Sequence, residues 1–143
     1  MREIKFRVWH KPTKQFVKQD IFYLDEPSSI GQLSVGLDGT LIQAGMYDDY
    51  SAVSDPEDYA IQQYTGLKDK NGVEIYEGDI VEWQYGLKYS DVFEYRKERF
   101  TITYCKEDAM FLGKKDPERH GGAERNWCLS KVVVGNIFEG VDK

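Results

Sequence analysis

The sequence predicts an all-β protein, built as a small barrel or as two joined small β-barrels of short antiparallel strands with little helix. Aromatic residues make up 14% of the 143 residues, and ten of these aromatic residues are tyrosines. Such residues favour the pleated, half-buried surface of a sheet. Turn dipeptides divide the chain at short intervals, and apolar residues between them alternate with polar ones, which is the period of a strand.

The length predicts a single domain over residues 1–143, with a division into two subdomains at about 1–62 and 63–143 as the alternative. Two cysteines are too few for a fold built on disulfides, so we expect Cys105 and Cys128 to be core residues. The N-terminus leads directly into a charged strand, and no apolar run approaches the roughly 20 residues that a membrane helix needs. We therefore expect a cytoplasmic location.

The first strand is predicted at the N-terminus, where Ile4, Phe6 and Val8 alternate with polar residues and should share one buried face. Pro12 then marks a turn, because it has no backbone N–H to give to a sheet. The chain is expected to return as a second strand over residues 15–24, which makes the pair a hairpin.

Further short strands are expected at residues 32–35 and 40–43, joined by an Asp-Gly tight turn. Residues 45–58 are polar and acidic, and they form an exposed loop or a flap in this prediction. A strand over residues 59–64 then leads into the central part of the chain.

The central stretch, residues 63–81, is the densest run of turn residues in the sequence. Asn71-Gly72 predicts a type I′ hairpin turn, because both central positions of that turn need positive φ. Gly78-Asp79 then turns the chain into the next strand. Five apolar residues between the turns are expected to point inward: Leu67, Val73, Ile75, Ile80 and Val81.

The chain after this stretch is harder to predict from its residues. Gly86 is expected to end the strand that begins near residue 80. Residues 87–98 are left with two alternatives, a short helix capped by Ser90 or a long excursion between strands.

The last third of the chain predicts further strands at residues 99–104 and 109–112. Residues 113–125 are charged and rich in glycine, as is typical of a solvent-facing loop. Residues 127–138 should close the fold, with a kink or bulge at Gly135-Asn136.

The central block Gln-Tyr-Thr-Gly-Leu-Lys-Asp-Lys-Asn-Gly-Val-Glu-Ile-Tyr-Glu-Gly-Asp-Ile-Val resembles the central signature of the YopX-like family of phage and prophage proteins. The opening Met-Arg-Glu-Ile-Lys-Phe-Arg-Val-Trp and the segment 133–139 resemble the first and last strands of that family. The resemblance implies one YopX-like domain with small, unusual β-barrels, encoded by phages or prophages of bacteria. It implies no activity, so no functional residue is carried over.

The charge of the chain, −6 in total, is unevenly distributed. Residues 1–18 carry six basic side chains and one acidic, whereas residues 20–58 carry nine acidic side chains and no basic one. Either the acidic loops are simply solvated, or they attract the basic N-terminal hairpin of the same or a neighbouring subunit. The second explanation gives a candidate interaction surface of Arg2, Lys5, Arg7, Lys11, Asp48, Asp49, Asp55 and Asp58.

The sequence predicts no catalytic, metal or cofactor site. His10 and His120 are its two imidazoles, and Cys105, Cys128 and His120 lack the short paired spacings of a zinc site. Neither a Gly-x-Ser-x-Gly elbow, a His-Glu-x-x-His helix nor a phosphate-binding glycine fingerprint is present. The sequence favours a non-enzyme over an enzyme, and we expect no cofactor.

The function predicted first is a non-catalytic interaction or assembly module that forms a homo-oligomer and contacts a phage or host protein. The alternative is a small β-barrel that binds single-stranded nucleic acid, with bases stacked on aromatic rings and Lys5, Arg7 and Lys11 along one face. The net negative charge opposes non-specific phosphate binding, so nucleic acid is ranked second. No membrane partner is expected.

Overall fold

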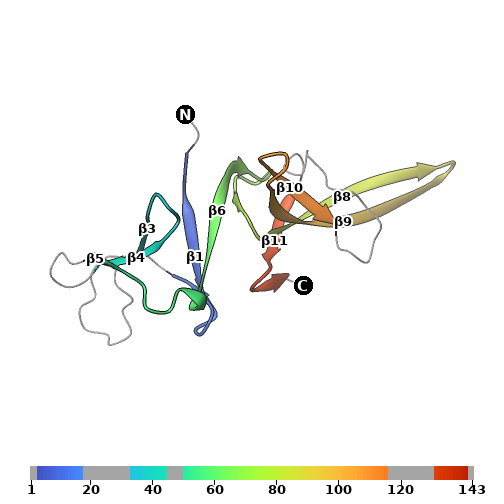
Figure 1. The fold of residues 1–143 in the computed structure, drawn as a ribbon. Helices are drawn as coiled ribbons and strands as arrows, with labels where there is room; N and C mark the ends of the chain where they lie inside the picture. The colour runs from blue at the N-terminus through green and yellow to red at the C-terminus, as the bar shows by residue number, and fades with distance from the viewer. Residues whose placement is uncertain (1–2, 18–32, 45–49, 116–130, 142–143) are drawn as a thin grey trace. The chain divides into compact units, whose positions relative to one another are not determined.

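The computed structural model describes residues 3–17, 33–44, 50–115 and 131–141 (Figure 1). These residues form antiparallel β-sheets, one of them curled into a half-barrel, and their single helical element is the 3₁₀ turn η1 (Pro56–Asp58). The predicted all-β class with barrel character is thus confirmed. None of the described segments is a helix with the length and apolar character needed to cross a membrane.

The chain divides into two compact units. Unit 1 consists of Met1–Lys5 and Gln62–Lys143, and unit 2 consists of Phe6–Ile61. Strand β6 (Tyr59–Lys68) begins in unit 2 and ends in unit 1.

Unit 2 contains a short hairpin and a three-stranded sheet. The hairpin joins β1 (Phe6–His10) to β2 (Gln15–Phe16), as predicted for its described residues. The sheet has the order β3 (Leu33–Val35), β4 (Leu41–Ala44), β5 (Tyr50–Ala52). The predicted Asp-Gly turn lies between the first two of these strands, with its glycine at a φ of +84°.

The core of unit 2 corrects the predicted N-terminal face. It is made by four buried side chains: Val8, Leu33, Leu41 and Val53. Of the three alternating residues only Val8 is buried, whereas Ile4 and Phe6 are exposed. Trp9 is buried instead, with its ring 4.9 Å from that of Phe16. Since neighbouring residues of a strand point to opposite faces, β1 is covered on both faces at Val8 and Trp9, which single-face alternation does not predict.

Unit 1 is built around a five-stranded antiparallel sheet with the order β10–β9–β8–β11–β12. Its strands are β8 (Asp79–Tyr89), β9 (Val92–Cys105), β10 (Met110–Lys115), β11 (Val132–Asn136) and β12 (Gly140–Val141). Strand β7 (Glu74–Tyr76) pairs with the end of β6. The core consists of Ile75, Val81, Phe100, Ile102 and Phe111.

The predicted irregularity near the C-terminus is confirmed. The pairing of β11 with β8 shifts register between Val133 and Gly135, as a bulge does. A Cβ atom on Gly135 would lie 2.0 Å from the carbonyl oxygen of Gly140 in β12. The glycine therefore allows the two backbones to approach each other closely.

The central stretch forms turns where they were expected, but the first turn has a different type. Only Gly72 of the Asn71-Gly72 pair has positive φ, at +83°, so the turn is not type I′. Instead, Asp69 N donates to the carbonyl of Val73 (2.8 Å), and Gly72 N donates to the carbonyl of Asp69 (3.0 Å). Ile75 and Val81 are buried as predicted, whereas Leu67 and Val73 are exposed.

The carboxylate of Asp69 holds this turn in place. Its Oδ1 accepts hydrogen bonds from Asn71 N (2.8 Å) and Val73 N (2.9 Å), and its Oδ2 accepts one from Val133 N (3.0 Å) in β11. Burial raises the pKa of Asp69, but the three backbone donors outweigh burial and hold the pKa below its ordinary value. The Asp69 side chain thus stabilises the turn internally and also links it to β11, a strand distant in the sequence.

Candidate functional site

Strands β8 and β9 continue well beyond the sheet from which they start (Figure 1). β11 pairs with β8 as far as Glu82, and β10 pairs with β9 as far as Phe100. Past these residues β8 and β9 pair with each other from Trp83 and Glu98 to Tyr89 and Val92, without a further strand neighbour among the described residues. We call residues 83–98 the arm.

The arm corrects two sequence predictions. Residues 87–98 are neither a helix nor a loop, but the two strands and the tight Ser90-Asp91 turn of a hairpin. Ser90 adopts a φ of +51°, and does not cap a helix. Gly86 does not end its strand either, because β8 continues to Tyr89.

The ring of Phe93 explains how the arm carries a glycine within a strand. A Cβ atom on Gly86 would lie 2.3 Å from the Cζ atom of Phe93, so the ring covers the position where a side chain would be. The ring also meets that of Tyr95 edge to face, with 4.7 Å between centroids. Cross-strand packing of an aromatic ring on a glycine compensates for the missing side chain.

The register gives the arm two faces, because residues directly opposite each other in a pair of strands point to the same side. Face A carries Trp83, Tyr85, Leu87, Tyr89, Val92, Glu94, Arg96 and Glu98. Face B carries Gln84, Gly86, Lys88, Phe93, Tyr95 and Lys97. Face A therefore combines three aromatic rings with charges of both signs, whereas face B combines two aromatic rings with two lysines.

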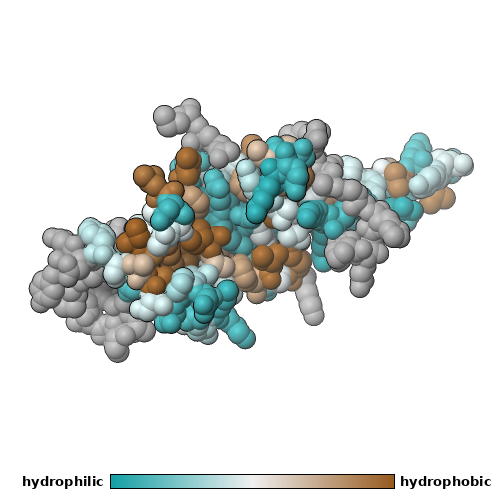
Figure 2. All heavy atoms as spheres, in the orientation of Figure 1, coloured by the Kyte–Doolittle hydropathy of each residue, from teal (hydrophilic) through white to brown (hydrophobic). Residues whose placement is uncertain are grey.

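The tip of the arm exposes apolar and aromatic side chains to solvent. The exposed fractions are 57% for Tyr89, 65% for Val92, 56% for Phe93 and 67% for Tyr95, and Figure 2 shows apolar residues at this end of the molecule. Exposed apolar groups that gather in one place commonly mark a binding surface. A two-stranded hairpin is also only marginally stable by itself in water. Both considerations make the arm the candidate interaction surface of the protein.

Ion pairs lie at the base of the arm and further along it. At its base, Glu82 binds Arg99 Nε (3.0 Å) and Lys97 Nζ (3.3 Å). Burial raises the pKa of Glu82, but these two cations lower it, and the pKa lies below its ordinary value. Further out, Arg96 contacts Glu94 at 3.4 Å on the same face. An open polar hollow is lined by Tyr85, Glu94, Arg96, Lys97 and Glu98.

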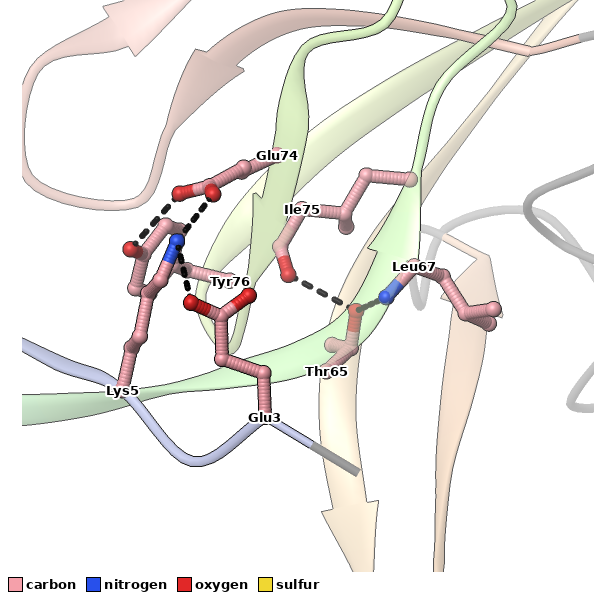
Figure 3. Close-up of polar contacts among 7 residues, drawn as sticks. All are labelled: Glu3, Lys5, Thr65, Leu67, Glu74, Ile75 and Tyr76. Carbon is pink, nitrogen blue, oxygen red and sulfur yellow. Dashed lines mark hydrogen bonds and ion pairs between the residues drawn. The ribbon is translucent and has the colours of Figure 1, made fainter. Parts of the chain in front are cut away.

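The residues of the interaction surface predicted from charge lie in different places. Arg2, Asp48 and Asp49 lie outside the described residues. Lys5 belongs to unit 1, where it binds Glu74 and, at 3.0 Å, Glu3 (Figure 3). These hydrogen bonds raise the pKa of Lys5, and the bond from Lys5 lowers the pKa of Glu74. The ammonium group is thus engaged within its own unit.

The other predicted residues belong to unit 2, and two of them meet. Lys11 Nζ donates to the carbonyl of Glu57 (2.7 Å), and Lys11 N donates to the carbonyl of Asp58 (2.8 Å), so the first hairpin contacts the acidic 3₁₀ turn. The guanidinium of Arg7 lies over the ring of Phe16, 4.5 Å from its centroid. Asp55 precedes the turn and accepts the backbone N–H of Asp58 on its carbonyl oxygen (3.0 Å).

No metal-binding cluster of three or more His, Cys, Asp or Glu residues occurs in the described part of the chain. His10 Nδ1 lies 2.7 Å from Thr13 Oγ1, and the thiol of Cys105 donates to Glu107 at 3.2 Å. His120 and Cys128 lie outside the described residues, so the prediction that they form no zinc site stays a prediction.

The sequence reasoning missed the arm because its turn lacks the usual dipeptide. Ser90-Asp91 is not one of the Asn-Gly or Asp-Gly pairs that mark a two-residue hairpin. A usable signal was present in the next residues, where Phe93 and Tyr95 alternate with Glu94 and Arg96. That alternation is the period of a strand with one aromatic and one charged face.

The fold and the site together define an antiparallel all-β protein that extends a two-stranded arm from its main sheet. Residues 5–141 match the YopX protein family, and the chain belongs to that family. It is similar to protein EF1440 from Enterococcus faecalis, known from a crystal structure, with 30% sequence identity over 97% of this chain and 96% of that chain and a TM-score of 0.56. A search of curated proteins gave no match.

Proposed function

We propose that the protein is a non-catalytic assembly module of a phage or prophage, which works in the cytoplasm as a homo-oligomer and uses its arm as the contact surface. The observation that carries this proposal is the exposure of Tyr89, Val92, Phe93 and Tyr95 at the tip of the arm. Removing such groups from water is the main favourable contribution to protein association. The match of residues 5–141 to the YopX family supports the proposed origin, because the central block resembles the signature of a family of phage and prophage proteins.

Light scattering of the whole chain tests the proposal. We expect a molar mass of more than one 16.6-kDa chain at low ionic strength. The variant Phe93→Ser/Tyr95→Ser should have the mass of a single chain, because it removes two exposed rings from the contact surface. Tyr50→Ser is the matched control, since Tyr50 is 70% exposed but lies in unit 2. A wild-type protein with the mass of one chain at all concentrations would contradict the proposal.

Face B of the arm favours a second candidate, the binding of single-stranded nucleic acid. Phe93 and Tyr95 could stack on bases, and Lys88 lies beside them on the same face. Lys97 lies on this face too, but it is paired with Glu82 at 3.3 Å. The N-terminal basic residues add less support, since Lys5 and Arg7 have partners in their own units. The net charge of −6 opposes this function, so it stays second.

Fluorescence anisotropy with a labelled oligothymidine tests the second candidate. Nucleic-acid binding predicts an increase in anisotropy at low salt that decreases steeply as salt is added. Replacing Lys88 with Glu should abolish it, whereas Lys106→Glu, on an exposed turn outside the arm, should not. An unchanged anisotropy at low salt would reject this candidate.

A further inference from the structure

The outer edge of β9 in the arm is available to pair with another strand. The pairing of β10 with β9 stops at Phe100, so residues 92–99 have no strand beyond them among the described residues. The backbone N–H and C=O groups along such an edge are a template for a further strand. The outer edge of β8 past Glu82 also lacks a further strand among the described residues. Its arm segment carries one charged residue, Lys88, so opposite charges cannot pair across two copies of that edge.

Symmetry restricts how two copies of one edge can meet. In a two-fold dimer the same surface of both subunits forms the interface. Two identical edges then run antiparallel about an axis perpendicular to the sheet, and this axis passes midway between one residue and its own copy. Because opposite residues share a face, each residue on one side of the axis is opposite the residue at the same distance on the other side.

Charge selects one of the possible registers for β9. An axis at Glu94, Arg96 or Lys97 places a charge opposite its own copy, and like charges directly opposite each other are destabilising. Axes at Val92, Phe93 and Tyr95 avoid this, and among them the axis at Tyr95 also brings opposite charges together. It places Glu94 opposite Arg96 of the second copy, and Arg96 opposite Glu94 of the second copy. Phe93 is then opposite Lys97 in both halves, which allows a cation–π contact.

We propose that the β9 edge of the arm binds the β9 edge of a second copy of this chain, antiparallel and centred on Tyr95. The two arms then form one continuous four-stranded sheet, and the exposed rings of Phe93 and Tyr95 gather on one of its faces. This inference rests on the proposed function, because it specifies the surface through which the chain assembles. Within one chain Arg96 Nη2 already lies 3.4 Å from Glu94 Oε2, so both side chains are on the face that the register requires.

Charge reversal on the full-length chain tests the register by light scattering. Glu94→Arg should place two positive charges opposite each other at both positions, and Arg96→Glu should do the same with negative charges. We expect each variant alone to have the mass of a single chain. The matched controls Glu139→Arg and Lys106→Glu reverse exposed charges of unit 1 outside the arm and should keep the wild-type mass.

Mixing the two variants separates contacts between chains from contacts within a chain. In an equimolar mixture, an arm with two positive residues meets an arm with two negative residues, and dimers should form again. The pair of residues 94 and 96 within each chain remains like-charged in the mixture, so recovery can only come from the partner. A mixture that stays at the mass of one chain overturns the inference.

A disulfide at the symmetry axis provides a second measurement. Residues directly opposite each other in an antiparallel pair have Cα atoms roughly 4.5–5.5 Å apart, which is within reach of a disulfide. After both native cysteines are replaced by Ser, Tyr95→Cys should form a disulfide-linked dimer on oxidation, whereas Tyr89→Cys, on the other strand, should not. Equal cross-linking of the two variants overturns the register.

The failure of this inference differs from the failure of the proposed function. A wild-type chain that is oligomeric, with Glu94→Arg and Arg96→Glu equally oligomeric, overturns the β9 edge but leaves assembly in place. A wild-type chain with the mass of one chain overturns both. Far-ultraviolet circular dichroism of each variant shows whether the chain is folded, and if a single variant is unfolded, the cysteine experiment decides.

Discussion

Replacing Phe100 with Ala is expected to lower the free energy of unfolding of unit 1 by roughly 3–5 kcal/mol, as for other large-to-small changes of buried aromatic residues. Phe100 is fully buried at the base of the arm, opposite Val81 in β8. The ammonium group of Lys131 lies 5.2 Å from the centre of its ring. Loss of the ring therefore opens a cavity and removes a cation–π contact from a buried lysine. Chemical denaturation monitored by Trp fluorescence measures the effect.

Phe93→Ala is the matched control for this prediction. It makes the same chemical change seven residues before Phe100 in β9, on a side chain that is largely exposed. We expect a loss of less than about 1 kcal/mol, as for most surface substitutions. Both variants should be compared at low protein concentration, since association would add to the apparent stability. Equal losses in the two variants would contradict the burial of Phe100 or the exposure of Phe93.

The central turns could be located from sequence because glycine marks them directly. Gly72 and Gly78 adopt φ angles of +83° and +84°, a region that residues with a side chain rarely occupy. The type of the first turn could not be predicted in the same way. It depends on the carboxylate of Asp69, which binds two backbone N–H groups in the turn and a third from Val133 in a distant strand.

The arm could not be predicted because two local rules are broken within it. Ser90 occupies a left-handed turn position that usually carries glycine, and Gly86 lies inside a strand that it would usually interrupt. The compensation for the glycine comes from Phe93 on the opposite strand. Such cross-strand packing follows from the register of the two strands, which the sequence does not show. The sequence therefore leaves a helix and a loop as alternatives for residues 87–98.

Charge patterns in the sequence showed where charges are, but not which of them meet. Lys5 was assigned to an interaction surface, yet it binds Glu74, 69 residues later in the chain. Lys11 does meet the acidic segment, and it does so through backbone carbonyls of Glu57 and Asp58. Attraction between side chains was the reason for expecting that contact, and it is not the interaction that the structure shows there.

The same limit explains why the charge pattern points to the N-terminal hairpin, whereas the exposed apolar side chains point to the arm. Net charge along the chain identifies long-range attraction, which mainly affects association rate and specificity. Exposed apolar area contributes more to affinity, but exposure depends on which face of a strand is covered. For Phe93 and Tyr95 that information comes from the register of β8 and β9.

Asp69→Asn is expected to destabilise unit 1 by roughly 2–4 kcal/mol at neutral pH, because hydrogen bonds to a charged acceptor are among the strong ones in proteins. Both carboxylate oxygens accept backbone hydrogen bonds. An amide has one oxygen, so its NH₂ group would face a backbone N–H whichever way the side chain is turned. Denaturation curves of the variant and the wild type at pH 7 measure the difference.

The difference should also depend on pH, in a direction set by the pKa of Asp69. The pKa in the folded protein lies below its ordinary value of roughly 3.9, so the folded state favours the charged form. The stabilisation is complete above the unfolded-state pKa and is lost as the pH falls through the folded-state pKa. The difference in free energy of unfolding between wild type and Asp69→Asn should therefore become smaller below about pH 4.

Asp91→Asn, on the exposed turn of the arm, is the control and should show no comparable difference from wild type. A gap for Asp69→Asn that stays constant on acidification would mean that the carboxylate does not hold the turn through its charge.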